Sequence, residues 1–190
     1  MPRPVVGTHL PLQAAMNSQH ELLQHLPRLR RYARALIHNQ ERADDLVQDT
    51  VERALSKLSH FQIGTDMRAW LFTIMHNVFA NEVRKPSFRS VHLSADDDLA
   101  EMEDITVSGN QFSSLEVRDL DYALQRLPVE QRQVVLLVGL DDMSYADVAL
   151  TLGIPIGTVM SRLSRGRERL RALMAGAALP VPATKLTVVK

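Results

Sequence analysis

Apolar residues recur at helical spacing along most of this sequence, and the apolar–polar alternation that marks β-strands is absent. This periodicity is the strongest constraint on the fold, because it predicts a chain built of helices alone. Pro27 lies inside the first helical pattern and is expected to kink or restart that helix. The predicted helices cover about residues 18–37, 41–58, 66–85, 114–127, 129–139, 144–152 and 155–174.

Residues 87–112 interrupt the helical pattern and carry six acidic side chains against one basic side chain. A polar, charged segment without periodicity is typical of a linker. The sequence therefore predicts an all-α fold of two small helical domains joined by a flexible acidic linker. The expected boundaries are a flexible arm (1–17), a first domain (18–86), the linker (87–112), a second domain (113–174) and a disordered tail (175–190).

The chain of 190 residues has 22 Lys and Arg, 22 Asp and Glu, and no cysteine. A net charge of zero normally counts against nucleic-acid binding, but here the acidic linker offsets two mildly basic domains. The missing cysteines exclude disulfides, iron–sulfur clusters and thiolate zinc sites. The start of the chain has no signal-peptide pattern, and the longest apolar run covers only 134–140. We expect a cytoplasmic protein that holds no cofactor and no metal.

The stretch 144–171 has the pattern of a helix-turn-helix motif: a short helix, a tight turn and a longer helix. Ala149 is small where the two helices approach, Gly153 suits a turn with positive φ, and Val159 can fill the angle between the helices. Ser144 is the expected N-cap, with Asp147 three residues later.

The last predicted helix carries five arginines and one acidic residue between 155 and 172. Val159, Leu163, Gly166 and Leu170 share one face, while Thr158, Arg162, Arg165 and Arg169 lie on the opposite side with Ser161 at its edge. A solvated surface is the alternative, but on the second helix of this motif the basic face favours DNA contact. Base contacts are expected from Thr158, Ser161, Arg162 and Arg165, and phosphate contacts from Arg167, Arg169 and Arg171.

The helix predicted at 41–58 has a polar stripe formed by Asp45, Gln48, Asp49, Glu52 and Ser56. An acidic stripe suits a basic protein partner better than it suits DNA. A merely solubilising face remains the alternative.

The helix predicted at 66–85 begins with Thr65 or Asp66 as N-cap. Its expected core face contains Met67, Trp70, Leu71, Ile74 and Val78, with Phe72, Phe79 and Lys85 at the margins. Thr73, His76, Asn77, Ala80 and Arg84 lie away from that core, and amides, aromatic rings and a basic end suit contact with unpaired bases.

Five segments together resemble the bacterial RNA polymerase sigma factors of the extracytoplasmic-function (ECF) type within the sigma-70 family. They are PRLRRYARAL (27–36), ADDLVQDTVERAL (43–55), MRAWLFTIMHNVFANEVRK (67–85), LPVEQRQVVLL (127–137) and MSYADVALTLGIPIGTVMSRLSRGRERL (143–170). The first and third of these segments look most like the general-stress subgroup.

The resemblance implies an alternative sigma factor whose first domain corresponds to region 2 and whose second corresponds to region 4. Region 2 would dock on the coiled coil of the polymerase β′ clamp through Asp45, Gln48, Asp49 and Glu52, and region 4 would bind the β flap. The −35 element would meet Thr158, Ser161, Arg162, Arg165, Arg167 and Arg169. The −10 element would be bound and melted by Phe61, Asp66, Arg68, Thr73, His76, Asn77, Arg84 and Lys85. The family also implies a response to stress and sequestration by an anti-sigma factor.

Two positions depart from the family pattern. Met160 stands where Lys is common, which removes one phosphate contact, and Gly166 stands where Ala is common. A glycine inside a helix costs about 1 kcal/mol relative to alanine.

Three other functions fit parts of the sequence. A free-standing helix-turn-helix repressor or activator needs a dimer interface or a ligand pocket, and neither is visible. An enzyme is disfavoured because the seven histidines are scattered and no HExxH, P-loop or GxGxxG motif occurs. A sigma-like decoy that binds only an anti-sigma factor is disfavoured by the intact arginine face.

Overall fold

The computed structural model describes residues 12–62, 64–84 and 114–176. Within these ranges every regular element is a helix, as the periodicity predicts. The expected linker at 87–112, Lys85, most of the arm and most of the tail lie outside the described residues. The first group of helices is α1 (Leu12–Leu36), α2 (Gln40–Ser56), the 3-10 turn η1 (Leu58–His60) and α3 (Met67–Val83). The second group is α5 (Ser114–Gln125), α6 (Val129–Gly139), α7 (Tyr145–Leu152) and α8 (Ile156–Met174).

Helix α1 differs from its prediction at two points. It begins at Leu12, so part of the expected flexible arm is helical, and it continues through Pro27 without a restart. Proline removes one backbone hydrogen bond from a helix. The fully buried side chains of Leu22 and Leu29 lie on either side of Pro27, and their packing holds the helix to the core across that missing bond.

The ends of the helices follow local capping signals in the sequence. The side chain of Asn39 accepts from the Arg42 amide at α2, and Asp66 accepts from the Arg68 and Ala69 amides at α3. Ser144 caps α7 as predicted, accepting from the Asp147 amide. Gly153 ends α7 with φ 63° and ψ 34°, the left-handed conformation expected of the turn.

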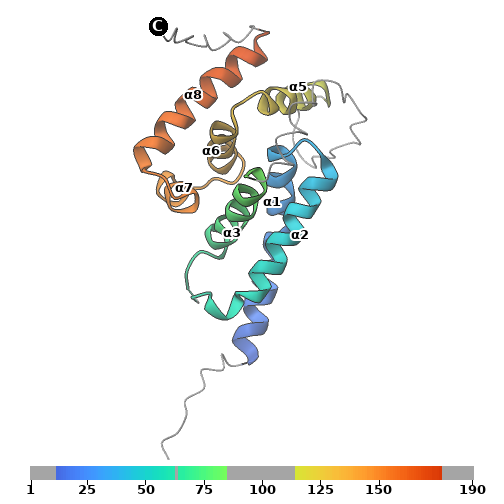
Figure 1. Cartoon of the computed structure of the whole chain (residues 1–190), viewed down its shortest axis with the longest axis vertical. Helices are drawn as coiled ribbons and strands as arrows, with labels where there is room; N and C mark the ends of the chain where they lie inside the picture. The colour runs from blue at the N-terminus through green and yellow to red at the C-terminus, as the bar shows by residue number, and fades with distance from the viewer. Residues whose placement is uncertain (1–11, 63, 85–113, 177–190) are drawn as a thin grey trace, which may run out of the picture.

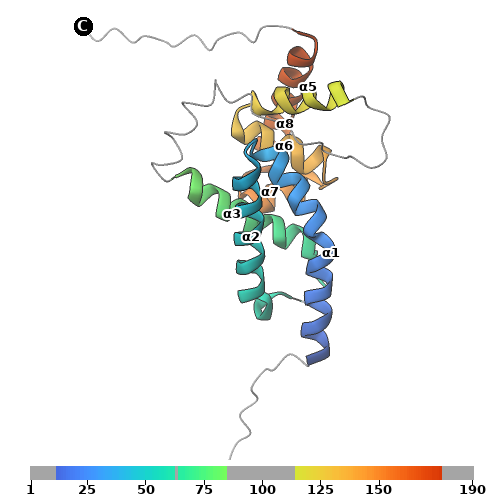
Figure 2. The ribbon, with the colours of Figure 1, turned by 90° about the vertical axis from the view of Figure 1, so that its right-hand side faces the viewer.

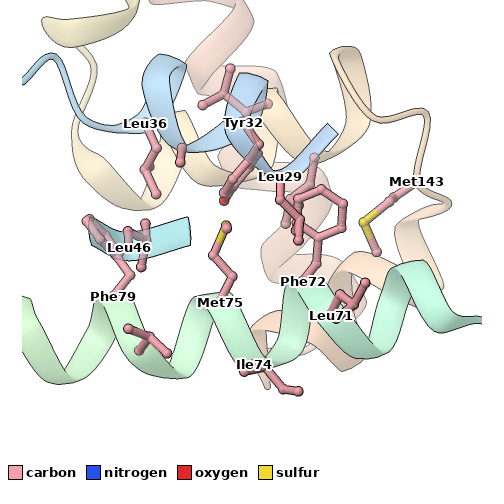
Figure 3. Packing of buried hydrophobic residues seen from close by; sticks show 14 of the residues in the cluster. Leu29, Tyr32, Leu36, Leu46, Leu71, Phe72, Ile74, Met75, Phe79 and Met143 are labelled. Carbon is pink, nitrogen blue, oxygen red and sulfur yellow. The ribbon is translucent and has the colours of Figure 1, made fainter. Parts of the chain in front are cut away.

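The core of the first group forms where α1 and α2 face α3. Figure 3 shows Phe72, Met75 and Phe79 of α3 pointing toward Tyr32 of α1 and Leu46 of α2. The rings of Tyr32 and Phe72 meet edge to face, with centroids 5.1 Å apart. Phe72 and Phe79 were expected at the margins of the core, and this prediction is wrong: both are buried, at 2% and 3% exposure.

In the second group α8 packs closely on α6, and Gly166 of α8 faces Gln131 and Val135 of α6. A Cβ atom added to Gly166 would lie only 2.7 Å from the Cγ2 methyl of Val135. Glycine therefore gives this helix pair the room that alanine would fill, which explains the departure from the family pattern in structural terms.

The two groups of helices pack against each other. Helix α3 packs on α2 and also on α7 of the second group, and α1 packs on α5 and α6 (Figures 1 and 2). The buried apolar residues of both groups form one continuous cluster, and Met143, before α7, points toward Leu71 and Phe72 of α3 (Figure 3). This packing explains why α3 is buried on more than one face. The sequence predicts two domains but not that they pack together.

No single described helix is both long and apolar enough to cross a membrane. Helices α7 and α8 satisfy that test only as a pair, and the pair is bent by 104°, which lies within the range typical of a helix-turn-helix. Among the described residues, no three His, Asp or Glu side chains are grouped so as to hold a metal ion.

Candidate functional sites

The arginine-rich face of α8 is exposed on the second helix of the bent pair. Arg165, Arg167 and Arg169 are exposed, as is Ser161. Thr158 and Arg162 are half-buried, and at 100° per residue they lie about a quarter turn from the buried stripe and not opposite it. The exposed guanidinium groups form the cationic surface that a DNA backbone attracts.

Met160 lies beside this face and is 48% exposed. It lines a shallow depression together with Tyr145 of α7 and with Ser164, Arg167 and Arg171 of α8. At a position where the family commonly has Lys, α8 therefore presents an apolar side chain beside a tyrosine.

The acidic stripe of α2 borders a groove between α1 and α2. Asp45, Gln48 and Glu52 are exposed, while Asp49 is half-buried and lies 3.8 Å from the guanidinium of Arg53. The groove has a volume of about 610 Å³. Its apolar lining comes from Leu26, Val47, Val51 and Leu55, and its polar rims from Arg30, Arg34, Asp44, Gln48 and Glu52. Apolar side chains between charged rims suit a protein partner.

The residues predicted to meet unpaired bases occupy three different environments around α3. Asp66, Asn77 and Arg84 are exposed. Arg68, Thr73 and His76 are half-buried, and burial lowers the pKa of His76. Phe61 is buried at 6% exposure, with its ring centroid 5.1 Å from that of Trp70. The structure therefore brings most of these side chains to one helix, but it covers the ring of Phe61.

Charged and polar side chains line the contact between the two groups, which we call the seam. The Nη2 atom of Arg31 donates to the Leu140 carbonyl at 3.0 Å, and the Nη1 atom of Arg68 donates to the Asp141 carbonyl at 3.0 Å. The carboxylate of Asp141 is fully buried, 3.7 Å from Arg31, and within the described chain neither of its oxygens accepts a hydrogen bond. Burial raises the pKa of Asp141 to about 6, against the opposing effect of Arg31.

Four further contacts cross the seam. The Nη1 atom of Arg132 donates to the Leu36 carbonyl at 2.7 Å, and the Nε2 atom of Gln125 donates to the Ala35 carbonyl at 3.1 Å. Gln133 Nε2 lies 3.2 Å from His76 Nδ1. The Asp121 carboxylate lies 3.2 Å from His38 Nδ1. Sequence reasoning did not identify Arg132 or Asp141, because neither residue type nor spacing distinguishes them from ordinary surface charges.

Comparison with known families matches both groups of helices separately. Residues 22–76 match the model described as the Sigma2 domain of PhyR, and residues 118–170 match the model of sigma-70 region 4. These matches cover the acidic stripe of α2, most of α3 and the arginine face of α8.

Two relatives extend the similarity across both groups. The ECF RNA polymerase sigma factor EcfG of Rhodopseudomonas palustris is 40% identical over 154 residues, which cover 81% of this chain and 83% of the relative. SigE of Mycolicibacterium smegmatis, also an ECF RNA polymerase sigma factor, is 39% identical over 165 residues, which cover 86% of this chain and 64% of the relative.

Two solved structures have the same fold. One is the sigma factor RpoE in complex with the anti-sigma factor NepR from Bartonella quintana, with a TM-score of 0.69 and 39% identity. The match covers 84% of this chain and 97% of that chain. The other is CnrH in complex with the cytosolic domain of CnrY, with a TM-score of 0.60, 26% identity, and coverage of 87% and 95%. The resemblance based on five sequence segments is confirmed, and the chain belongs to the ECF sigma factors of the sigma-70 family.

Proposed function

We propose that this sigma factor directs core RNA polymerase to promoters whose −35 element is bound by α8 and whose −10 element is bound and melted by α3. The observation that carries the proposal is the division of charge between surfaces. The arginines of α8 are exposed at a helix-turn-helix, while the acidic stripe of α2 is exposed on the other group of helices. A chain with separate surfaces for DNA and for a basic protein suits a polymerase subunit better than a free-standing repressor.

On α8 we assign the −35 contacts to Ser161, Arg165, Arg167 and Arg169, which are exposed, with Thr158 and Arg162 at the edge of this surface. On α3 the exposed amide of Asn77 and the guanidinium of Arg84 are available to unpaired bases and phosphates. Arg68, Thr73 and His76 belong to the same proposed surface, and Asp66 holds the start of the helix. Lys85 follows Arg84 in the sequence and is assigned to the same proposed −10 surface, although it lies just beyond the described residues.

The α2 stripe is the proposed docking site for the β′ clamp, and the apolar surface of the second group is proposed to meet the β flap. Regulation by an anti-sigma factor, and a role in the response to stress, are further parts of the proposal. The RpoE–NepR and CnrH–CnrY complexes support the first of these, because both relatives are held by a protein partner.

Run-off transcription with purified core polymerase tests this function. With a library of promoter fragments, we expect transcripts that depend on added protein and come from a subset of fragments that share two sequence elements. Core polymerase alone supplies the background. Transcription no more selective than that of core polymerase would contradict the proposal.

A further inference from the structure

The exposed face at the start of α8 presents an apolar side chain to solvent. Met160 is 48% exposed, and Arg165 is the one charged residue among the exposed positions of 156–165. The other exposed arginines of α8 all lie closer to the end of the helix. The part of α8 that is expected to meet base edges is therefore largely uncharged, and Met160 is a large apolar group within it.

Met160 lies between a basic rim and an exposed tyrosine. The depression that it lines has a volume of about 250 Å³, with Tyr145 and Leu163 as the other apolar residues and with Arg167 and Arg171 as its cations. A rise of 1.5 Å per residue places Met160 about 10 Å from Arg167 along the helix. The major groove of DNA is about 12 Å wide. One strand can therefore place a phosphate at Arg167 and a base edge at Met160.

We propose that Met160 recognises a thymine of the −35 element through the C5 methyl group of that base. In the major groove the other three bases present only hydrogen-bond donors and acceptors, whereas thymine adds a methyl group. The side chain of Met160 has no polar hydrogen and only a weak acceptor, so the methyl group is its best partner. This inference rests on the proposed −35 role of α8 and adds a residue that determines specificity.

The exchange of lysine for methionine changes what this position contributes to binding. A lysine here would hold a phosphate, which strengthens binding to every sequence alike. Met160 gives up that general affinity, and contact with a methyl group removes part of its exposed apolar surface from water. Its unbranched, flexible side chain can adapt to a base edge. Arg167, Arg169 and Arg171 remain for the phosphates.

An exposed methionine beside a tyrosine also suits a protein partner. The two arginines at the rim of the depression, Arg167 and Arg171, favour a polyanion instead, because they would remain unpaired against an apolar protein surface. DNA is therefore the partner that satisfies both the apolar and the cationic side chains of this depression.

Replacement of single thymidines by deoxyuridine tests the inference, because deoxyuridine lacks only the C5 methyl group. Holoenzyme is titrated onto labelled duplexes of a promoter that it transcribes, each with one such replacement in the −35 element of either strand, and fluorescence anisotropy gives the affinities. The variants are Met160→Ala and Met160→Lys. The control is Leu150→Ala, because Leu150 is 79% exposed on α7 and does not line the depression.

For the natural protein and for Leu150→Ala, we expect one replacement to weaken binding about fourfold, the effect of one buried methyl group. Met160→Ala and Met160→Lys should not distinguish the two bases at that position, and Met160→Lys should bind with a steeper dependence on salt. Each comparison uses one protein preparation, so the ratio of affinities does not depend on its active fraction.

Equal affinity of the natural holoenzyme for thymidine and deoxyuridine at every −35 position would overturn the inference. So would a methyl effect that persists in Met160→Ala. A loss of core polymerase binding by Met160→Ala, with the methyl effect unchanged, would assign Met160 to a protein contact instead. If base-pair substitutions in the −35 element do not affect binding of the natural holoenzyme, the proposed function itself fails.

Discussion

The guanidinium of Arg132 closes the end of α1 by donating to the carbonyl of Leu36, 2.7 Å away. The same side chain donates to the carbonyls of Gln125 and Leu127, and it is 7% exposed. A cation at the C-terminal end of a helix satisfies carbonyls that have no partner within the helix. One residue of α6 thus holds together the turn between α5 and α6 and the end of a helix from the other group.

Replacing Arg132 with leucine should lower the free energy of unfolding by about 2–3 kcal/mol, because buried carbonyls lose a charged donor. Urea unfolding followed by circular dichroism measures the change. The matched control is Arg118→Leu, an exposed arginine of α5, for which a change within about 0.5 kcal/mol is expected. Equal effects of the two substitutions would show that the Arg132 contacts add nothing to stability.

The two groups of helices are packed together at the seam, which we call the closed state, and this packing should depend on pH through Asp141. The pKa of Asp141 in the closed state is raised to about 6 from an ordinary value of 3.8, so the closed state binds a proton more readily. This contribution to closure is fully present below about pH 4 and is lost as the pH rises through about 6. At pH 7.5, Asp141→Asn should therefore favour the closed state by about a hundredfold, because it removes a buried charge and each pKa unit corresponds to a factor of about ten.

Fluorescence energy transfer between labels on Lys57→Cys in the first group and Met174→Cys in the second measures closure; both positions are exposed. Other groups at the seam also carry charge. Arg28 and Arg31 of α1, Arg68 of α3 and the neighbouring Asp142 act on Asp141, whereas Tyr32 stays neutral because burial and the charge of Asp141 raise its pKa. The pKa of His76 is lowered by burial, so protonation of His76 opposes closure in acid. The difference between wild type and Asp141→Asn isolates the carboxylate, and parallel pH curves for the two proteins would contradict its role.

Reversing one charge on the α2 stripe should weaken docking on core polymerase. Glu52→Arg places a cation in the exposed stripe beside the groove, and we expect at least a tenfold loss of affinity in a co-elution or fluorescence assay. Glu130→Arg reverses an exposed charge on α6 and should leave docking unchanged. If both variants bind core polymerase like the wild type, the stripe is only a solubilising face.

Gly166→Ala tests the close approach of α6 and α8. Alanine favours the helix by about 1 kcal/mol, but overpacking costs about 1–3 kcal/mol. Because the stiff side chain of Val135 lies 2.7 Å from the new Cβ, we expect a net destabilisation of about 1 kcal/mol.

Thermal or urea unfolding compares this variant with Gly157→Ala, which meets no atom within 4 Å and should not destabilise the protein. Adding Val135→Ala to Gly166→Ala should cost less than Val135→Ala costs in the natural chain. Independent effects of the two substitutions would show that Gly166 is not needed for close packing.

The local structure of this chain is predictable because its signals are local. Asp66, Ser144 and Gly153 mark helix ends by side-chain chemistry or by backbone freedom, and the helices lie close to where periodicity places them, apart from the early start of α1 and its continuation through Pro27. The exposure of the α2 stripe and of the α8 arginines follows from the same helical geometry.

The seam is not predictable from one sequence, because it depends on contacts between segments about 70 to 110 residues apart. The residues that flank Asp141 in the sequence do not distinguish it from an exposed acidic residue in a turn. Phe72 and Phe79 were placed at the margins of the core because one helical face was expected to be buried, whereas α3 packs on both groups.

The central claim is that α3 and α8 bind different promoter elements on behalf of polymerase. Selection from a randomised promoter library by holoenzyme, followed by sequencing of the transcribed fragments, tests it most directly. With Asn77→Ala we expect altered preference in the −10 element alone. With Arg165→Ala we expect altered preference in the −35 element alone, with a loss of about 1–3 kcal/mol at the base that it contacts. Identical selected sequences from the wild type and both variants would contradict the claim.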